Sequence, residues 1–233
     1  MKILAVNFLA ALSQTVAGFG APLISMPFMI NWLGLGIATP LSTLIGLLTS
    51  IIVLIYYRSQ FSFNEVGDLI IPAILGVPVG VFFLTGIDIK LAETLLAVVI
   101  IAYAVYSVFA PSLPALREHY WGYAFGFAAG VMGGAFNISG PIVVIYAAFR
   151  QWSPEKFRSN LQGFFLVTNI VIMLSYWGAG ALDGAYWTAF GWALPGMLMG
   201  IIFGIYLSKR INVVRFRQLV IVLLFVSGIY LLV

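Results

Sequence analysis

An interruption in a long apolar stretch constrains this fold more than any other feature of the sequence. Residues 120–149 are almost entirely apolar, but residues 133–141 read Gly-Gly-Ala-Phe-Asn-Ile-Ser-Gly-Pro. Glycine leaves the backbone unrestrained, and proline disrupts the interior of a helix but suits its first turn. The sequence therefore predicts that one helix ends here and that a new half-helix begins at Pro141, with Asn137 and Ser139 as N-terminal capping residues.

The composition places this interruption in a membrane. Hydrophobic residues make up 63% of the 233 residues and charged residues only 8%, whereas soluble domains carry about 25% charged residues. We therefore expect an all-α polytopic membrane protein. Unpaired backbone N–H groups are costly in lipid, so such a break persists only where protein or a water-filled cavity surrounds it. Because a helix N-terminus carries partial positive charge and free N–H groups, the break predicts an anion site at mid-membrane.

A second interruption at an equivalent position indicates two homologous halves. Residues 18–22 read Gly-Phe-Gly-Ala-Pro, and residues 21–24 align with residues 140–143. Three apolar spans follow each break, at residues 38–57, 69–86 and 91–109 and at residues 158–177, 186–207 and 216–233. We expect repeats over residues 1–110 and 118–233 that together form one membrane transport domain. Internal duplication with interrupted segments at matching positions is typical of secondary transporters.

Each interrupted segment either crosses the membrane or dips in and returns as a re-entrant hairpin. Lys and Arg are enriched in cytoplasmic loops, and the re-entrant arrangement places nine of the eleven on one face, against eight if the segments cross. Three crossings then separate equivalent points of the two halves, so the re-entrant arrangement also makes them inverted repeats. We favour it for these reasons, and eight crossings remain the alternative.

Glycines at every fourth position predict close contacts between helices. This spacing occurs in three rows, namely Gly122, Gly126 and Gly130, Gly196, Gly200 and Gly204, and Gly76 and Gly80. Because small residues let membrane helices approach closely, we expect these rows to pack the protein's own helices together. A homodimer interface is the alternative use.

Polar residues inside the expected spans are candidates for a substrate site. Gln162 and Asn169 lie seven positions apart, hence on one helix face. A comparable stripe in residues 38–57 consists of Thr39, Ser42, Thr43, Gly46, Thr49 and Ser50. Both stripes should point into the bundle, because polar side chains are costly in lipid. The alternative is hydrogen bonding between helices, or to a helix's own backbone, without any ligand. With the two breaks, the expected site consists of Gln14, Gly20, Ala21, Thr43, Thr49, Ser50, Asn137, Ser139, Gly140, Gln162 and Asn169.

Residue types missing from the spans exclude several other functions. No Asp or Glu falls in the middle of an expected span, although cation carriers usually place a carboxylate there. Arg158, at the start of its span, is one of the basic residues expected at the cytoplasmic face. Alternatively, it helps to attract the anion from the cytoplasm, and we include it in the expected site. The chain has no cysteine and a single histidine, His119, so we expect no metal and no cofactor. No Ser–His or Asp–Asp pair lies within the spans, so we expect no enzyme.

The net charge of +4 is explained by membrane topology, because no basic run interleaves with exposed aromatic residues. We therefore expect the lipid bilayer and a small anion as partners, and no nucleic acid.

The two glycine-rich elements, residues 18–22 and 133–141, each open one half of the chain. They resemble the hallmarks of the TauE/SafE sulfite exporter family. The two-fold duplication and the four hydrophobic segments per half also match, so the resemblance covers the whole chain. It implies the export of sulfite, sulfonates or related organosulfur acids.

We therefore predict a multi-pass protein of the cell membrane that exports a small sulfur-containing anion. The substrate would pass through a midplane site built from both broken segments. A passive, channel-like anion pore is the first alternative, and a structural membrane subunit without a substrate is the second.

Overall fold

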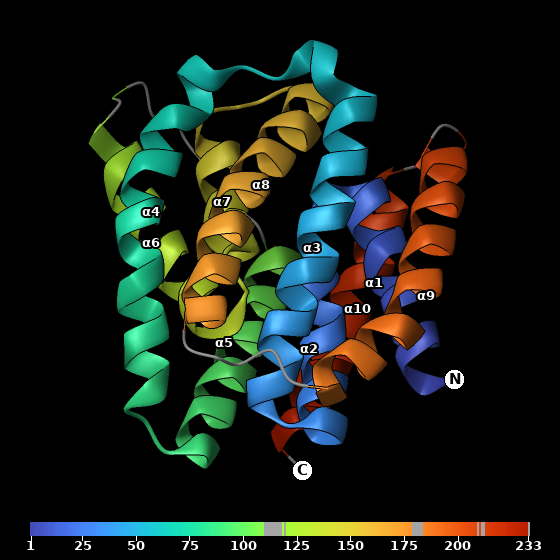
Figure 1. Ribbon diagram of the computed structural model, residues 1–233. Coiled ribbons are helices and arrows are strands. Elements are labelled where there is room, and N and C mark those ends of the chain that lie inside the picture. The colour runs from blue at the N-terminus through green and yellow to red at the C-terminus, as the bar shows by residue number, and fades with distance from the viewer. Residues whose placement is uncertain (110–117, 119, 179–183, 209, 211–212, 233) are drawn as a thin grey trace.

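The computed structural model describes residues 1–109, 118, 120–178, 184–208, 210 and 213–232. All regular secondary structure within these residues is helical (Figure 1). The elements are α1 (Lys2–Ala17), α2 (Ala21–Leu33), α3 (Leu35–Tyr57), the 3₁₀ turn η1 (Arg58–Gln60), α4 (Phe63–Thr85), α5 (Ile89–Phe109), α6 (Tyr120–Phe136), α7 (Gly140–Phe149), α8 (Pro154–Gly178), α9 (Gly184–Ser208) and α10 (Val213–Leu232). Helices α3, α4, α5, α8 and α9 are long and apolar enough to cross a membrane, so the chain is a multi-pass α-helical membrane protein.

The spans expected from the sequence correspond to α3, α4, α5, α8, α9 and α10, and several begin earlier than expected. Helix α4 begins at Phe63 and α8 begins at Pro154. Their first turns contain the acidic residues Glu65 and Glu155, which are favourable next to the positive end of a helix. Proline suits the first turn as well. Residues 111–117, between the two expected repeats, lie outside the described residues.

Two pairs of short helices, α1 with α2 and α6 with α7, fold back on themselves. Lys2, at the start of α1, places its Nζ atom 5.8 Å from the ring centroid of Trp32, near the end of α2. In the second pair, the ring centroids of Phe125 and Phe149 are 6.0 Å apart, although these residues lie near the start of α6 and at the end of α7. Each pair therefore returns to the end of the bundle where it began.

Rows of glycine bring longer helices into backbone contact. A Cβ atom on Gly80 of α4 would collide with the carbonyl oxygen of Val131 on α6, and a Cβ atom on Gly126 of α6 would collide with that of Leu69 on α4. Gly200 of α9 likewise lies against a backbone carbonyl of α1. Figure 1 shows α4 beside α6 and α1 beside α9. These rows therefore pack the protein's own helices together, as expected.

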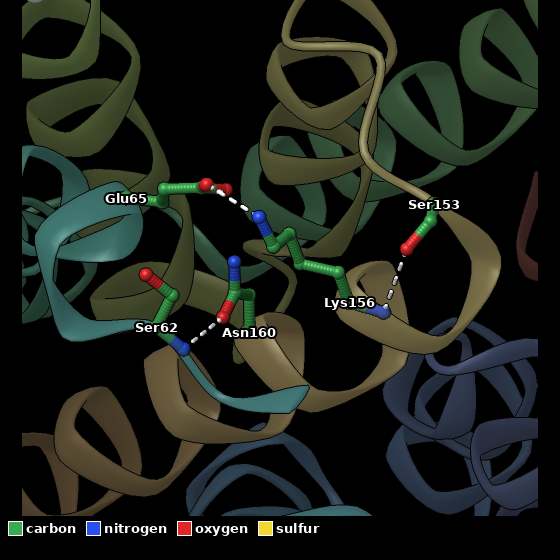
Figure 2. Close-up of polar contacts among 5 residues, drawn as sticks. All are labelled: Ser62, Glu65, Ser153, Lys156 and Asn160. Atoms are coloured by element: carbon green, nitrogen blue, oxygen red, sulfur yellow. Dashed lines mark hydrogen bonds and ion pairs between the residues drawn. The ribbon is translucent and has the colours of Figure 1, made fainter. Parts of the chain in front are cut away.

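Polar contacts tie helices of both halves together at one end of the bundle, where α3 and α9 end and α4 and α8 begin. Lys156 of α8 forms an ion pair with Glu65 of α4, with 2.6 Å between Nζ and Oε1. The backbone N–H of Ser62 donates to Oδ1 of Asn160 at 2.9 Å (Figure 2). We call this the basic end. The basic residues there whose side chains are described are Arg58, Arg150, Lys156, Arg158 and Arg210, whereas Lys2 and Lys90 lie at the opposite end.

Candidate substrate site

The two interruptions between short helices lie against each other inside the bundle. Helix α2 begins at Ala21, and Gly18 and Gly20 before it have φ angles of 86° and 104°, which glycine adopts without strain. Helix α7 begins at Gly140. A Cβ atom on Gly140 would lie 3.8 Å from the Cβ atom of Phe19, which is between α1 and α2. The N-termini of α2 and α7 therefore face the same region.

Asn137 has a different role from the one expected. Its φ angle is +56°, and its backbone N–H donates to the carbonyl of Gly133 at 2.8 Å, so it ends α6. The prediction that Asn137 caps the following helix was wrong, because a left-handed residue suits the C-terminal end of a helix and asparagine tolerates that conformation. Its side-chain Nδ2 donates to Oγ of Ser42 on α3 at 3.2 Å. Ser139 does occupy the N-cap position of α7, but its side chain makes no capping hydrogen bond.

A small pocket lies where the two breaks meet. The volume of its cavity that the centre of a water molecule can occupy is about 20 Å³. One ordered water requires roughly this volume. None of the lining residues is charged. The residues that line it are Gln14, Gly20, Pro22, Leu23, Gly46, Asn137, Ile138, Ser139, Gly140, Phe165 and Asn169.

The polar groups of this pocket are neutral and most can donate hydrogen bonds. Gln14, Asn137 and Asn169 present side-chain amides, and Ser139 presents a hydroxyl. The first N–H groups of α2 and α7 have no partner within their own helices, and each helix start carries partial positive charge. Gly46 makes room for Asn169, because a Cβ atom there would lie 3.0 Å from Nδ2 of Asn169. Donors without a lining carboxylate complement an anion.

Gln162 lies beside the pocket and is connected to it through Gln14. Nε2 of Gln14 donates to Oε1 of Gln162 at 3.1 Å and to Oγ of Ser50 at 3.4 Å. Nε2 of Gln162 in turn donates to the carbonyl of Gly18 at 2.9 Å. Gln14 and Gln162, which we call the glutamine pair, thus join the first break to α8. Both residues are buried.

Six residues expected in the site do not line the pocket. Gln162 and Ser50 contact Gln14 beside it, and the other four make contacts elsewhere. Thr43 and Thr49 donate to carbonyls of their own helix at 2.9 Å and 2.7 Å, which is the alternative that the sequence left open. Ala21 begins α2 without lining the cavity. Arg158 lies at the basic end, where its guanidinium carbon is 5.6 Å from the ring centroid of Tyr57.

Several residues at the pocket were not among the expected site residues, namely Ser42 beside it and Pro22, Leu23, Gly46, Ile138 and Phe165 in its lining. Ser42 is buried and accepts the amide of Asn137, and Phe165 lines the cavity. Ser42 lies seven positions before Thr49 in the same polar stripe, so its spacing indicated the inward face of α3. Phe165 had no such signal, because aromatic residues are common throughout this chain.

Comparison with known proteins gives a family and no individual relative. The family model described as sulfite exporter TauE/SafE matches residues 3–231. Searches of curated proteins and of solved structures found no match to this chain. The family match spans nearly the whole chain and includes both breaks and the pocket between them. This protein therefore belongs to the TauE/SafE sulfite exporter family.

Proposed function

We propose that this protein is a secondary transporter that exports a small sulfur-containing anion, such as sulfite, a sulfonate or a related organosulfur acid. One observation carries the proposal: the N-termini of α2 and α7 converge on a pocket lined by three amides, one hydroxyl and no charged side chain. Such a site attracts negative charge without holding it as tightly as a buried arginine would. Membership of the family supports a sulfur oxyanion as its substrate.

The proposed architecture is a pair of inverted repeats over residues 1–110 and 118–233, which form one transport domain. Each repeat begins with a re-entrant hairpin, α1–α2 or α6–α7, and continues with three crossing helices. The pairing of helices supports this arrangement, because α4 packs on α6 as its counterpart α9 packs on α1. Likewise α4 contacts α8, as α9 contacts α3. This symmetry brings the two breaks together at mid-membrane.

The basic end of the bundle faces the cytoplasm in this proposal. Five basic residues with described side chains lie there, against Lys2 and Lys90 at the opposite end. The excess agrees with the positive-inside rule. We propose the cell membrane as the bilayer, so the anion would leave the cell from the basic end toward the end that carries Lys2.

The size of the cavity supports a carrier over an open pore. About 20 Å³ of free space is room for roughly one water molecule, so a sulfur oxyanion needs a rearrangement of the helices to bind and to leave. The lining also lacks a nucleophile paired with a base, and we propose no chemical step on the substrate.

Ligand-dependent thermal stability of the purified protein tests the proposal. Sulfite, sulfate, thiosulfate, taurine, isethionate and sulfoacetate would each be compared with chloride at matched ionic strength. A ligand present at 100 times its Kd stabilises the folded state by about 2.7 kcal/mol, so at least one sulfur anion should raise Tm above the chloride value. The assignment is wrong if none does so.

Counterflow in proteoliposomes then separates the carrier from the pore. Unlabelled substrate inside the vesicles should accelerate the uptake of labelled substrate if the site alternates between the two faces. A pore predicts flux that does not depend on substrate on the far side.

A further inference from the structure

Arg158 lies on the same face of α8 as the pocket but far from it along the helix. Gln162 follows Arg158 by four positions and Asn169 by eleven, spacings that keep all three near one face. Eleven residues correspond to about 16 Å along a helix axis. Asn169 lines the pocket, whereas Arg158 lies at the basic end. Any role of Arg158 with the anion therefore belongs to a second location.

Arg158 is a buried residue, and no carboxylate of the described residues pairs with it. Only 9% of the residue is exposed. Its Nη1 atom donates to the hydroxyl of Tyr57 at 3.4 Å, and its planar group lies over the ring of the same residue. A buried cation of this kind is costly unless it is compensated. Since a guanidinium has five N–H groups, most of its donors remain available to an anion.

The C-terminal end of α1 offsets part of this cost. A Cβ atom on Gly18 would lie 3.2 Å from Cγ of Arg158, so the stem of the arginine packs directly against the end of α1. The C-terminus of a helix carries partial negative charge and favours a cation. This contact means that Arg158 also stabilises the end of α1. An experiment must therefore measure stability and anion binding separately.

The glutamine pair lies between Arg158 and the pocket. Gln162 contacts the carbonyl of Gly18, next to the stem of Arg158, and Gln14 contacts both Gln162 and the cavity. The amides of these two residues are donors as well as acceptors. An anion that moves inward from Arg158 would therefore meet the donors of these two amides, which bond to each other in this structure.

We propose that the guanidinium of Arg158 forms a first binding site for the sulfur anion at the cytoplasmic face. The hydroxyl of Tyr57 positions this guanidinium, because it accepts from Arg158 and donates its own proton to Ser208. The glutamine pair separates this site from the central pocket. The inference rests on the proposed function, since it names the place where that substrate first binds. An arginine suits this role, because its planar fork can bind two oxygens of a sulfite or sulfonate group at once.

Transport measured separately from the two faces tests this site. Inside-out and right-side-out membrane vesicles would be given radiolabelled sulfite, and KM, kcat and the Tm of the purified protein would be compared for each variant. Removing the hydrogen bonds to a charged group weakens binding by about 10- to 150-fold. Arg158→Gln should therefore raise KM at the cytoplasmic face by roughly that factor and leave KM at the outer face unchanged.

Two further variants define the cause of that effect. Arg158→Lys keeps the charge but loses the fork, so its cytoplasmic KM should lie between those of wild type and Arg158→Gln. Arg58→Gln is the matched control, because it removes an exposed arginine from the same end and should leave KM unchanged.

The salt dependence of transport gives a further test. Raising the salt concentration from about 0.01 to 0.15 M should increase the cytoplasmic KM of wild type. The same change should increase the KM of Arg158→Gln much less.

The proposal is overturned if Arg158→Gln keeps the wild-type cytoplasmic KM and its salt dependence. It is also overturned if KM rises equally at both faces while Tm falls, because Arg158 then only stabilises the end of α1. If Arg158→Gln does not fold, a wild-type cytoplasmic KM in Arg158→Lys is the overturning result. Asn137→Asp serves as the test of the central pocket, since it should impair transport from both faces. Normal transport by that variant would show that the central pocket does not bind the anion. The result at Arg158 would then be judged separately.

Discussion

Substitution of Asn137 separates the backbone role of this residue from its role in the pocket. Asn137 is 5% exposed, has a φ angle of +56° and bonds to Ser42 through its amide. Asn137→Gly keeps the left-handed backbone without strain but removes the side chain. Asn137→Ala removes the same amide and adds the strain of a left-handed alanine. Asn137→Asp keeps the shape and places a carboxylate between the two helix N-termini.

The expected stabilities follow from these differences. Loss of the hydrogen bond to Ser42 should cost about 0.5–1.5 kcal/mol in Asn137→Gly. The left-handed conformation should cost Asn137→Ala about 1–2 kcal/mol more. Asn137→Asp should stay close to wild type, because aspartate tolerates this conformation and is favourable near helix N-termini. The Tm values should therefore decrease in the order wild type or Asp, then Gly, then Ala.

Anion binding should follow a different order. The glycine and alanine variants lose the same donor, so both should bind sulfite about 10- to 150-fold more weakly than wild type. Asn137→Asp should not bind sulfite measurably, because its carboxylate repels the ligand. Thermal unfolding and calorimetric titration of the purified variants measure the two orders. A stable Asn137→Asp protein that binds sulfite with wild-type affinity would refute the anion-site assignment at this residue.

Three further predictions concern packing, topology and the basic end. Gly126→Ala should lower Tm strongly, because overpacking costs about 1–3 kcal/mol and the added Cβ atom would meet a backbone carbonyl of α4; an unchanged Tm would contradict the glycine contact. In the inverted-repeat arrangement, Gly34→Cys should react with an impermeant thiol reagent in intact cells, whereas Arg58→Cys should react only after lysis; labelling of Arg58→Cys in intact cells would exclude the proposed orientation. Lys156→Met should lower the free energy of unfolding by only about 0–1 kcal/mol, because Lys156 and Glu65 are 34% and 28% exposed; a much larger loss in chemical unfolding would show that this ion pair is buried in the membrane.

Several features of this protein follow from short stretches of sequence. The low charge content determined the membrane class, and the spacing of glycines indicated which faces of α4, α6 and α9 pack closely. Helices α2 and α7 begin at Ala21 and Gly140, the aligned positions next to proline. Glycine and proline act on the backbone of their immediate neighbours, and this is why a sequence reveals such positions without knowledge of the fold.

The composition of the pocket depended on contacts between distant segments. Asn137 bonds to Ser42 across 95 positions and Gln14 to Gln162 across 148 positions. Thr43 stands next to Ser42 in the same helix, yet it bonds to its own backbone. Both are hydroxyl residues in one polar stripe, and the sequence led us to expect Thr43, not Ser42, in the site. Their roles differ because a hydroxyl contributes to a site only where another helix brings a partner to it, and that partner is decided by tertiary packing.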